Sequence, residues 1–394
     1  MRPFSRLFVA STLSNLGDGV LLASLPLLAR SLSSSPIAVS AVTVAATAPW
    51  LVFGLVAGTV VDRVDRVRLM VAVDAARALV LGLFAALVAV DAMTLPVAVA
   101  LVALAGVGET LFDTAAQAVV PLLVAEDDLE RANGRLFGAQ LAANGFVGPP
   151  LGALLFGAMA AMPFGLDALT FVASAALLLR LPLVRARCRI RQHARTTTIR
   201  ADVGEGLRWL WADRGVRAFA IGAAVINVAH TGVMAVAVLF LRDELGVGPV
   251  GFGIALAGMT VGGLAGSLSA GAVVRRLGRR RAVVGAIAAF GVALVAAGAA
   301  PHVVAATVGI ALFNAAGEVW NVVAVSYRQA RVPDRLLGRV MASYRVIAYG
   351  AMPTGALLGG VVASGFGLRA PFAVGAVLVA GLLVWFVPAT RDAL

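Results

Sequence analysis

The stretch Gly58-Thr-Val-Val-Asp62-Arg63-Val-Asp65-Arg66-Val-Arg68 joins two long apolar segments, and it returns later in the chain as Gly271-Ala-Val-Val-Arg275-Arg276-Leu-Gly278-Arg279-Arg280-Arg281. In both copies a glycine stands four residues before the first charge, and basic residues follow at the same three offsets. The copies lie 213 positions apart in a chain of 394 residues, so they divide it into two halves of similar length. The sequence therefore contains an internal repeat.

The composition is strongly apolar. Apolar residues make up 61% of the chain, charged residues make up 13%, and the mean hydropathy is +0.96. A water-soluble domain of this composition would lack enough polar residues to cover its surface. Because a membrane-spanning helix needs about 20 apolar residues, the sequence predicts an all-α polytopic membrane protein.

Twelve apolar stretches with short connectors fill the chain and leave no room for a separate soluble domain. Six lie within residues 1–184 and six within 217–394, and a basic connector at 185–216 joins the two halves. Apolar residues at helical spacing in this connector favour an interfacial helix over 199–216, with a flexible linker as the alternative. The predicted spans cover 7–29, 37–61, 69–90, 95–119, 134–159, 166–184, the end of the connector to 241, 250–274, 282–300, 303–325, 337–362 and 371–387.

The basic residues follow the topology of a membrane protein. All 32 are arginines, and they gather in alternate connectors. With an even number of spans both termini lie on one side, and only Arg30, Arg242 and Arg369 fall on the other. The positive-inside rule then places both termini in the cytoplasm. Topology explains the net charge of +12, so no nucleic-acid partner is predicted, and the lone Cys188 excludes a disulfide framework.

The repeated stretch resembles the loop between helices 2 and 3 of major facilitator superfamily transporters and its relic between helices 8 and 9. It departs from the family pattern at Asp65, where glycine is usual, and at Arg275, where the acid stood. The segments at 14–18, 129–133 and 332–339 also resemble bacterial multidrug and siderophore exporters of this superfamily. The resemblance implies two pseudo-symmetric bundles of six helices each.

A glycine- and proline-rich stretch, 144–152, is similar to the helix 5 antiporter motif found mainly in exporters of this superfamily. Its counterpart at 355–360 keeps the four-residue glycine spacing but has lost the following proline. We expect these positions to let helices approach and bend as the two bundles rock. The residues are Gly148, Pro149 and Gly152 in the first half and Gly355 and Gly359 in the second.

Polar residues inside the spans have a regular distribution. A charge in the bilayer core costs about 2.5 to 3.5 kcal/mol on insertion scales, so such residues face protein or a water-filled cavity. In the first, fourth, seventh and tenth spans they recur three or four positions apart, hence on one face. The resemblance implies that these four spans line a central cavity, where substrate and protons bind. Its predicted residues are Asn15, Asp18, Glu109, Asp113, Asn227, His230, Asn314, Glu318 and Asn321.

Each of these polar residues also has a structural interpretation. The asparagines are as well suited to hydrogen bonds between helices as to contact with substrate, and His230 is open to both roles. The carboxyls favour proton coupling, because a mid-membrane acid must be paired, protonated or hydrated. Asp74 and Arg77, one turn apart, are interpreted as a structural pair near the hairpin. Span 4 has no arginine of the kind that drug antiporters often carry, which leaves coupling to the acids.

The resemblance further implies that the two hairpins form a cytoplasmic gate. Asp62 is the acid that the family pattern would place against the start of helix 11, just after Pro333-Asp334-Arg335-Leu336. The unpaired amide groups there are suited to a carboxylate. The remaining gate residues are Gly58, Arg63, Arg66, Arg68, Gly271, Arg275, Arg279 and Arg281.

The sequence carries no pattern typical of an enzyme. It has no Walker loop, metal-ligand motif or Ser/His/Asp arrangement, so neither cofactor nor metal is expected. The predicted function is proton-driven export of small amphipathic molecules by a monomer in the inner (plasma) membrane. An importer of a nutrient or lipid, an uncoupled facilitator and a non-transporting sensor are the alternatives. The four polar faces hold four carboxyls and no arginine, which favours neutral or cationic substrates.

Overall fold

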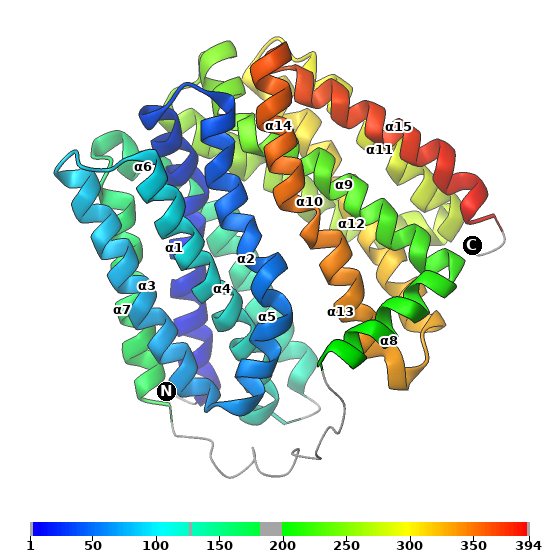
Figure 1. Ribbon diagram of the computed structural model, residues 1–394, viewed down its shortest axis with the longest axis horizontal. Coiled ribbons are helices and arrows are strands. Elements are labelled where there is room, and N and C mark those ends of the chain that lie inside the picture. The colour runs from blue at the N-terminus through cyan, green and yellow to red at the C-terminus, as the bar shows by residue number, and fades with distance from the viewer. Residues whose placement is uncertain (1–2, 126–127, 182–198, 392–394) are drawn as a thin grey trace. The chain divides into compact units, whose positions relative to one another are not determined.

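The structure is a computed structural model that describes residues 3–125, 128–181 and 199–391. Within these ranges all regular structure is helical, and twelve runs are long and apolar enough to cross a membrane. The predicted twelve-span, all-α fold is therefore confirmed (Figure 1). The helices of the first half are α1 (Pro3–Leu32), α2 (Pro36–Arg63), α3 (Arg66–Ala89), α4 (Leu95–Leu123), α5 (Leu129–Gln140), η2 (Leu141–Val147), α6 (Gly148–Ala158) and α7 (Met162–Leu179). They are followed by α8 (Ile199–Ala212), α9 (Arg214–Leu239), η4 (Phe240–Glu244), α10 (Pro249–Leu277), α11 (Arg279–Gly298), α12 (Val303–Arg331), α13 (Asp334–Gly350), α14 (Met352–Phe366) and α15 (Ala370–Ala389).

Three spans are not single α-helices. The fifth span passes from α5 through the π-helical segment η2 into α6, and the seventh ends in the π-helical η4. The eleventh breaks at Ala351, between α13 and α14. Prolines explain two of these interruptions: Pro149 and Pro150 have no N–H to donate to the preceding turn, and Pro353 lies in the first turn of α14.

The chain forms two compact units. Unit 1 comprises Met1–Ser34, Ala45–Arg195 and Gly248–Ala257, and unit 2 comprises Ser35–Val44, Thr196–Val247 and Gly258–Leu394. Each unit thus holds most of one half of the chain and one short segment from the other. The domain boundaries at residues 184 and 217 stay a prediction.

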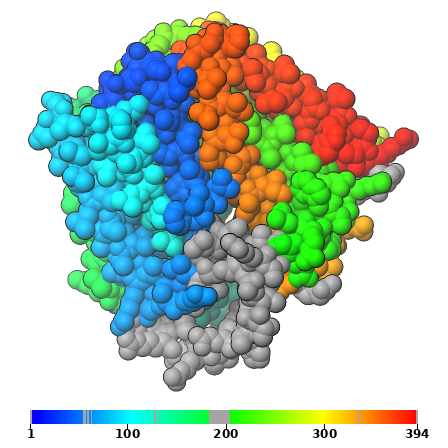
Figure 2. Space-filling model, viewed as in Figure 1, coloured from blue at the N-terminus to red at the C-terminus, as the bar shows by residue number. Residues whose placement is uncertain are grey.

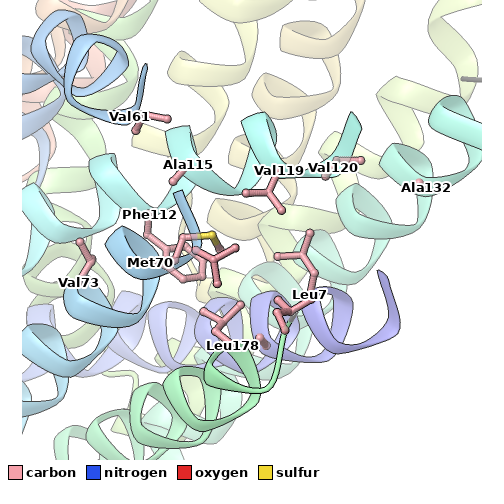
Figure 3. Packing of buried hydrophobic residues seen from close by; sticks show 13 residues of the cluster. Leu7, Val61, Met70, Val73, Phe112, Ala115, Val119, Val120, Ala132 and Leu178 are labelled. Carbon is pink, nitrogen blue, oxygen red and sulfur yellow. The ribbon is translucent and has the colours of Figure 1, made fainter. Parts of the chain in front are cut away.

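Unit 1 has an apolar core between α1, α3, α4 and α7. In Figure 3 the side chains of Leu7, Met70, Phe112 and Leu178 converge from these four helices. All four are at most 2% exposed. Their burial provides the main stabilisation of this part of the bundle.

Unit 2 is centred on aromatic side chains. The ring of Phe219 in α9 lies 5.2 Å from those of Trp320 and Tyr327 in α12 and 5.4 Å from that of Phe386 in α15. These edge-on and tilted contacts are the arrangements that aromatic rings prefer. They hold α9, α12 and α15 together near one end of the unit.

The outer face of α15 is apolar and exposed, as expected for contact with lipid. Val377 and Val384 are 71% and 76% exposed, and α15 has no charged residue. Figure 2 shows this helix in red on the surface of unit 2. A soluble protein would not present such a face to water.

The predicted interfacial segment contains the helix α8, within unit 2. α8 packs on α13, where a Cβ atom at Gly206 would overlap the carbonyl of Arg339. The side chain of Arg339 forms an ion pair with Glu205. Leu210 is fully buried while Trp211 is 52% exposed, so α8 presents one face to the bundle and another outward.

Candidate functional site

Unit 1 contains a buried ion pair between Asp18 of α1 and Arg77 of α3. The side chains are 15% and 3% exposed. This contradicts the interpretation of Asp74 and Arg77 as a local pair near the hairpin. Arg77 reaches across to the neighbouring helix because Gly108 of α4 leaves room for its side chain: a Cβ atom there would lie 2.8 Å from Cγ of Arg77.

Further carboxyls surround this pair. Glu109 and Asp113 of α4 and Asp167 of α7 all interact electrostatically with Arg77 or Asp18. The structure thus brings the predicted residues Asp18, Glu109 and Asp113 together. Asp74 of α3 interacts with the same two groups. We call Asp18, Asp74, Glu109, Asp113 and Asp167, together with Arg77, the acidic cluster.

The acidic cluster is short of hydrogen bonds. The hydroxyl of Ser174 in α7 lies near the fully buried carboxylate of Asp74, but neither oxygen of Asp74 accepts a hydrogen bond of normal geometry from a described residue, and neither does Oδ2 of Asp167. Thr170 donates from Oγ1 to Oδ1 of Asp167 at 3.2 Å. Arg77 stacks at 4.1 Å on the ring of Phe171, but its Nε and Nη1 have no partner in the described part of the chain. Unpaired buried groups are costly, so the cluster is kept at the expense of stability.

Three members of the acidic cluster, Asp74, Arg77 and Asp167, were not predicted from the sequence as site residues. Asp167 is the only acid in α7, but Thr170 and Ser174 follow it at helical spacing, and all three are buried. This polar stripe in an apolar span is the signal that would have found it. Arg77 was assigned to its nearest acid along the helix, because sequence spacing does not show which neighbouring helix a long side chain reaches.

The predicted site residues of unit 2 are mostly neutral. Asn227 of α9 donates to the carbonyl of Ala348 at 2.7 Å, and Asn314 of α12 donates to that of Met259 at 3.0 Å. His230 stacks on Phe313 with ring centroids 5.3 Å apart, and it also interacts with Asn314. The two asparagines thus join neighbouring helices, which is their structural interpretation.

Three predicted cavity residues have a different setting. Asn15 of α1 donates to the carbonyl of Ser11 in its own helix at 2.7 Å. Glu318 of α12 is half-buried, and Asn321, one turn further, is exposed. Within the described residues no hydrogen bond to the side chain of Glu318 or Asn321 occurs, and their role in the cavity stays a prediction.

The glycine motifs bring helices into backbone contact within each unit. In unit 1 a Cβ atom at Gly148 would overlap the backbone of Gly19, and one at Gly152 would overlap the carbonyl of Val20. Pro149 is buried beside them. The fifth span thus packs on α1 with no side chain between the two backbones.

Unit 2 repeats this arrangement. A Cβ atom at Gly359 would overlap the backbone of Gly232 in α9, and one at Gly355 would lie 2.5 Å from the carbonyl oxygen of Val228. Gly19 and Gly232 are separated by the same 213 positions as the two hairpin glycines. The internal repeat therefore extends to the packing of the first span on the fifth and the seventh on the eleventh.

The two hairpins differ in how they start the next helix. Asp65, at the position where the family has glycine, accepts a hydrogen bond from the backbone N–H of Arg68 at 3.0 Å and so caps α3. In the second copy Gly278 takes φ of 79°, a conformation that favours glycine. The first hairpin thus starts α3 with a side-chain cap from Asp65. The second starts α11 with a backbone conformation that glycine adopts readily.

The predicted gate residues are only partly described. Arg66 donates from Nη1 to the carbonyl of Ala118 in α4 at 3.1 Å, which ties the first hairpin to the bundle. The surroundings of Gly58 in α2 and the side chains of Asp62 in α2 and of Asp334 and Arg335 in α13 lie outside the described part of the structure. The exposed gate residues are Arg63, Arg68, Gly271, Arg275, Arg279 and Arg281.

No group of three or more potential metal ligands occurs among the residues that the structure describes. The acidic cluster also contains an arginine at its centre, whose charge opposes a metal ion. The arrangement is suited to holding protons or attracting organic cations.

The chain is similar over nearly its whole length to bacterial proteins named multidrug efflux pumps. The chain is 28% identical to the multidrug efflux pump Tap of Mycolicibacterium fortuitum, with 99% of this chain and 97% of that protein covered. It is 30% identical to Tap of Mycobacterium tuberculosis strain H37Rv, covering 99% and 94%.

Solved structures share the fold. The nucleoside transporter NupG superimposes with a TM-score of 0.80 at 13% identity, covering 99% of this chain and all of that one. A bacterial homologue of the iron transporter ferroportin, in its inward-facing state, gives a TM-score of 0.77 at 17% identity, covering 98% of each chain. The family model described as transmembrane secretion effector matches residues 1–391. The chain therefore belongs to the transmembrane secretion effector family of the major facilitator superfamily.

Proposed function

We propose that this transporter exports small amphipathic molecules, neutral or cationic, in exchange for protons. The observation that carries the proposal is the acidic cluster, which gathers five carboxyls around one buried arginine within unit 1. The similarity to proteins named multidrug efflux pumps supports the same direction of transport and a broad substrate range. The transporter acts as a monomer in the cell membrane with both termini in the cytoplasm.

Proton coupling follows from the charge balance of the cluster. Five carboxylates around one guanidinium would repel one another strongly in a medium of low dielectric constant. Binding of protons relieves this repulsion without any further ligand. Because the groups interact, the cluster titrates as a unit rather than residue by residue.

A change in proton occupancy can be converted into movement through Arg77. Its partner is Asp18 of α1, while Glu109 and Asp167 lie on α4 and α7. Protonation of Asp18 would release the guanidinium to the other two carboxyls, and loss of that proton would draw it back. α1 also packs closely on the fifth span through Gly19. A change of partner by Arg77 would therefore alter the forces on a helix that is in backbone contact with its neighbour.

Substrate binding is assigned to the polar faces that the sequence predicts, with Glu318 and Asn321 of unit 2 among them. Glu318 supplies a negative charge for a cationic substrate, and aromatic and apolar neighbours accommodate the rest of an amphipathic molecule. No step of bond making or breaking is required of the protein.

The proposal is tested in proteoliposomes that contain the purified transporter, with a fluorescent cationic dye as substrate and a pH-sensitive probe for protons. Addition of dye should release protons from the wild type. Single variants Asp18→Asn, Asp74→Asn, Glu109→Gln, Asp113→Asn and Asp167→Asn should include at least one that still moves dye down its gradient but no longer releases protons.

The matched control is Asp91→Asn, which neutralises an exposed carboxyl outside the cluster, in a loop position that asparagine tolerates. It should behave as wild type. Five cluster variants that all keep wild-type proton release would overturn the coupling proposal. Dye movement without any proton release by the wild type would instead favour an uncoupled facilitator.

A further inference from the structure

Unit 2 has a pocket of about 640 Å³ whose lining includes none of the predicted site residues. It lies where α8 ends and α9 begins, and the last turns of α12 and α15 complete its wall. Its polar lining is supplied by Asp213, Arg214, Arg217, Tyr327 and Arg331. The spans end here on the side that the arginine distribution assigns to the cytoplasm.

The pocket carries excess positive charge. Asp213 is its only acid, and both oxygens of that carboxylate are occupied. Oδ1 accepts from the backbone N–H of Val216 at 2.9 Å, and Oδ2 accepts from Nε of Arg331 at 2.9 Å. Asp213 thus balances one of the three arginines. Arg214 and Arg217 supply the surplus, with several N–H donors each.

The pocket has an apolar wall at the level expected for lipid head groups. Trp385 and Pro388 of α15 line it, and the indole of Trp385 is 40% exposed. Trp211, whose carbonyl accepts a hydrogen bond from Arg217 at 2.6 Å, is 52% exposed beside it. Tryptophans at the ends of spans lie at the membrane interface. The pocket therefore combines cationic donors with a surface that accepts the glycerol and upper acyl carbons of a lipid.

We propose that this pocket binds the phosphate group of an anionic phospholipid from the cytoplasmic leaflet. Guanidinium groups bind phosphate oxygens through paired hydrogen bonds, and basic pockets between spans on this side suit anionic head groups. A soluble phosphate would use the same arginines but gain nothing from the tryptophan and proline wall. Binding here would fix the junction of α8 and α9, and hence the end of the connector between the two halves of the chain.

The first experiment measures lipid binding to full-length transporter purified in detergent. Native mass spectrometry counts the lipids retained after titration with phosphatidylglycerol or phosphatidylcholine. The wild type should retain one phosphatidylglycerol with high affinity and show no comparable site for phosphatidylcholine. The variant Arg214→Gln/Arg217→Gln should bind phosphatidylglycerol about 25-fold more weakly, at roughly fivefold per arginine.

The matched control is Arg276→Gln/Arg280→Gln, which removes the same charge from two exposed arginines of unit 2 outside the pocket. It should retain the lipid. Because Arg217 also bonds to Trp211, the single variant Arg214→Gln is measured as well and should lose about fivefold. Thermal unfolding in phosphatidylcholine alone checks that all variants are folded.

Three results would overturn the proposal. Wild-type affinity in both Arg214 variants would remove the pocket from lipid binding. Equal binding of phosphatidylcholine would show that the charge is not recognised. Displacement of phosphatidylglycerol by millimolar inorganic phosphate would assign the pocket to a soluble anion instead. The same conclusion would follow if phosphate alone raised the unfolding temperature as much as phosphatidylglycerol does.

Discussion

Gly17 of α1 leaves the space that the carboxyl of Asp167 in α7 occupies. A Cβ atom at Gly17 would overlap Oδ1 of Asp167 and would lie 2.6 Å from Oγ1 of Thr170. The absence of a side chain at position 17 therefore lets α7 bring its acid close to Asp18, the next residue of α1. Replacement of Gly17 therefore tests both the packing of α1 on α7 and the place of the Asp167 carboxyl in the acidic cluster.

We predict that Gly17→Ala destabilises the transporter by about 1 to 3 kcal/mol, the usual cost of overpacking. Asp167→Ala in the same chain should restore part of this loss, because it removes the carboxyl that the methyl group would meet. The measurement is the free energy of unfolding of the four members of the cycle. Gly82→Ala, where a Cβ meets nothing within 4 Å, is the control. Equal effects at positions 17 and 82 would contradict the overlap.

Arg77 should be essential to the stability of unit 1 because it is the only cation in the acidic cluster. Removal of one partner of a buried ion pair costs about 3 to 5 kcal/mol. Arg77→Gln is thus expected to lower the unfolding free energy by this amount and to stop export. Asp18→Asn added to Arg77→Gln should recover stability but not transport. The exposed Arg280→Gln serves as control, and a double variant no more stable than Arg77→Gln would argue against the pair.

The close packing of the fifth span on α1 should not tolerate a large side chain. Gly148→Leu is expected to abolish export, since its Cβ would overlap the backbone of Gly19, which cannot move aside as a side chain can. Gly359→Leu should do the same against Gly232 in unit 2. Gly157→Leu, at an exposed position of α6 with open space, is the control. Dye export and membrane insertion are compared; normal export by Gly148→Leu would refute the prediction.

The two hairpins should respond differently to substitution. Asp65→Ala removes the cap of α3 and should cost about 1 kcal/mol, while Asp65→Asn, which can still accept the bond, should cost less. Gly278→Ala should cost about 1 to 3 kcal/mol, because φ of 79° with ψ of 157° is a backbone conformation nearly confined to glycine. The measurement is the free energy of unfolding of each of the three variants, compared with that of the wild type. A neutral Asp65→Ala would show that the cap has no energetic role.

Asp62 tests the gate that the resemblance implies. Asp62→Asn should be expressed normally and lose transport, because a capping carboxylate is worth about 0.3 to 2 kcal/mol and its loss shifts a balanced inward–outward equilibrium several-fold. Labelling of Asn321→Cys from the cytoplasmic side, with the native Cys188 replaced by serine, should rise in this background, because a weakened gate leaves the cavity open to that side for longer. Asn321→Cys alone provides the reference. Equal labelling together with normal export would exclude Asp62 from the gate.

The twelve spans could be predicted because a run of apolar residues is a local property of the chain. Grouping of Asp18, Glu109 and Asp113 was also within reach, since acids at mid-span must face the interior. The position of the Arg77 side chain could not be predicted in the same way, because it depends on the space that Gly108 leaves on a different helix. The break at Ala351 and the π-helical segment η2 depend on backbone hydrogen bonds that prolines remove, but a proline does not determine which of the preceding turns changes its hydrogen bonding.

The π-helical segment η2 also affects how this chain is aligned with its relatives. A π-helical turn accommodates one residue more than an α-helical turn over the same length. Deletion of one residue between Leu141 and Val147 would let this stretch close into a regular α-helix, because the π-helical turn takes up the extra residue locally, without passing on the rotation of about 100° that one residue adds to an α-helix. α6 would keep its orientation relative to α5, and Gly148 and Gly152 would still face Gly19 and Val20. A family member without this extra residue is therefore expected to keep its packing glycines at the aligned positions, with a single-residue gap in this part of the alignment.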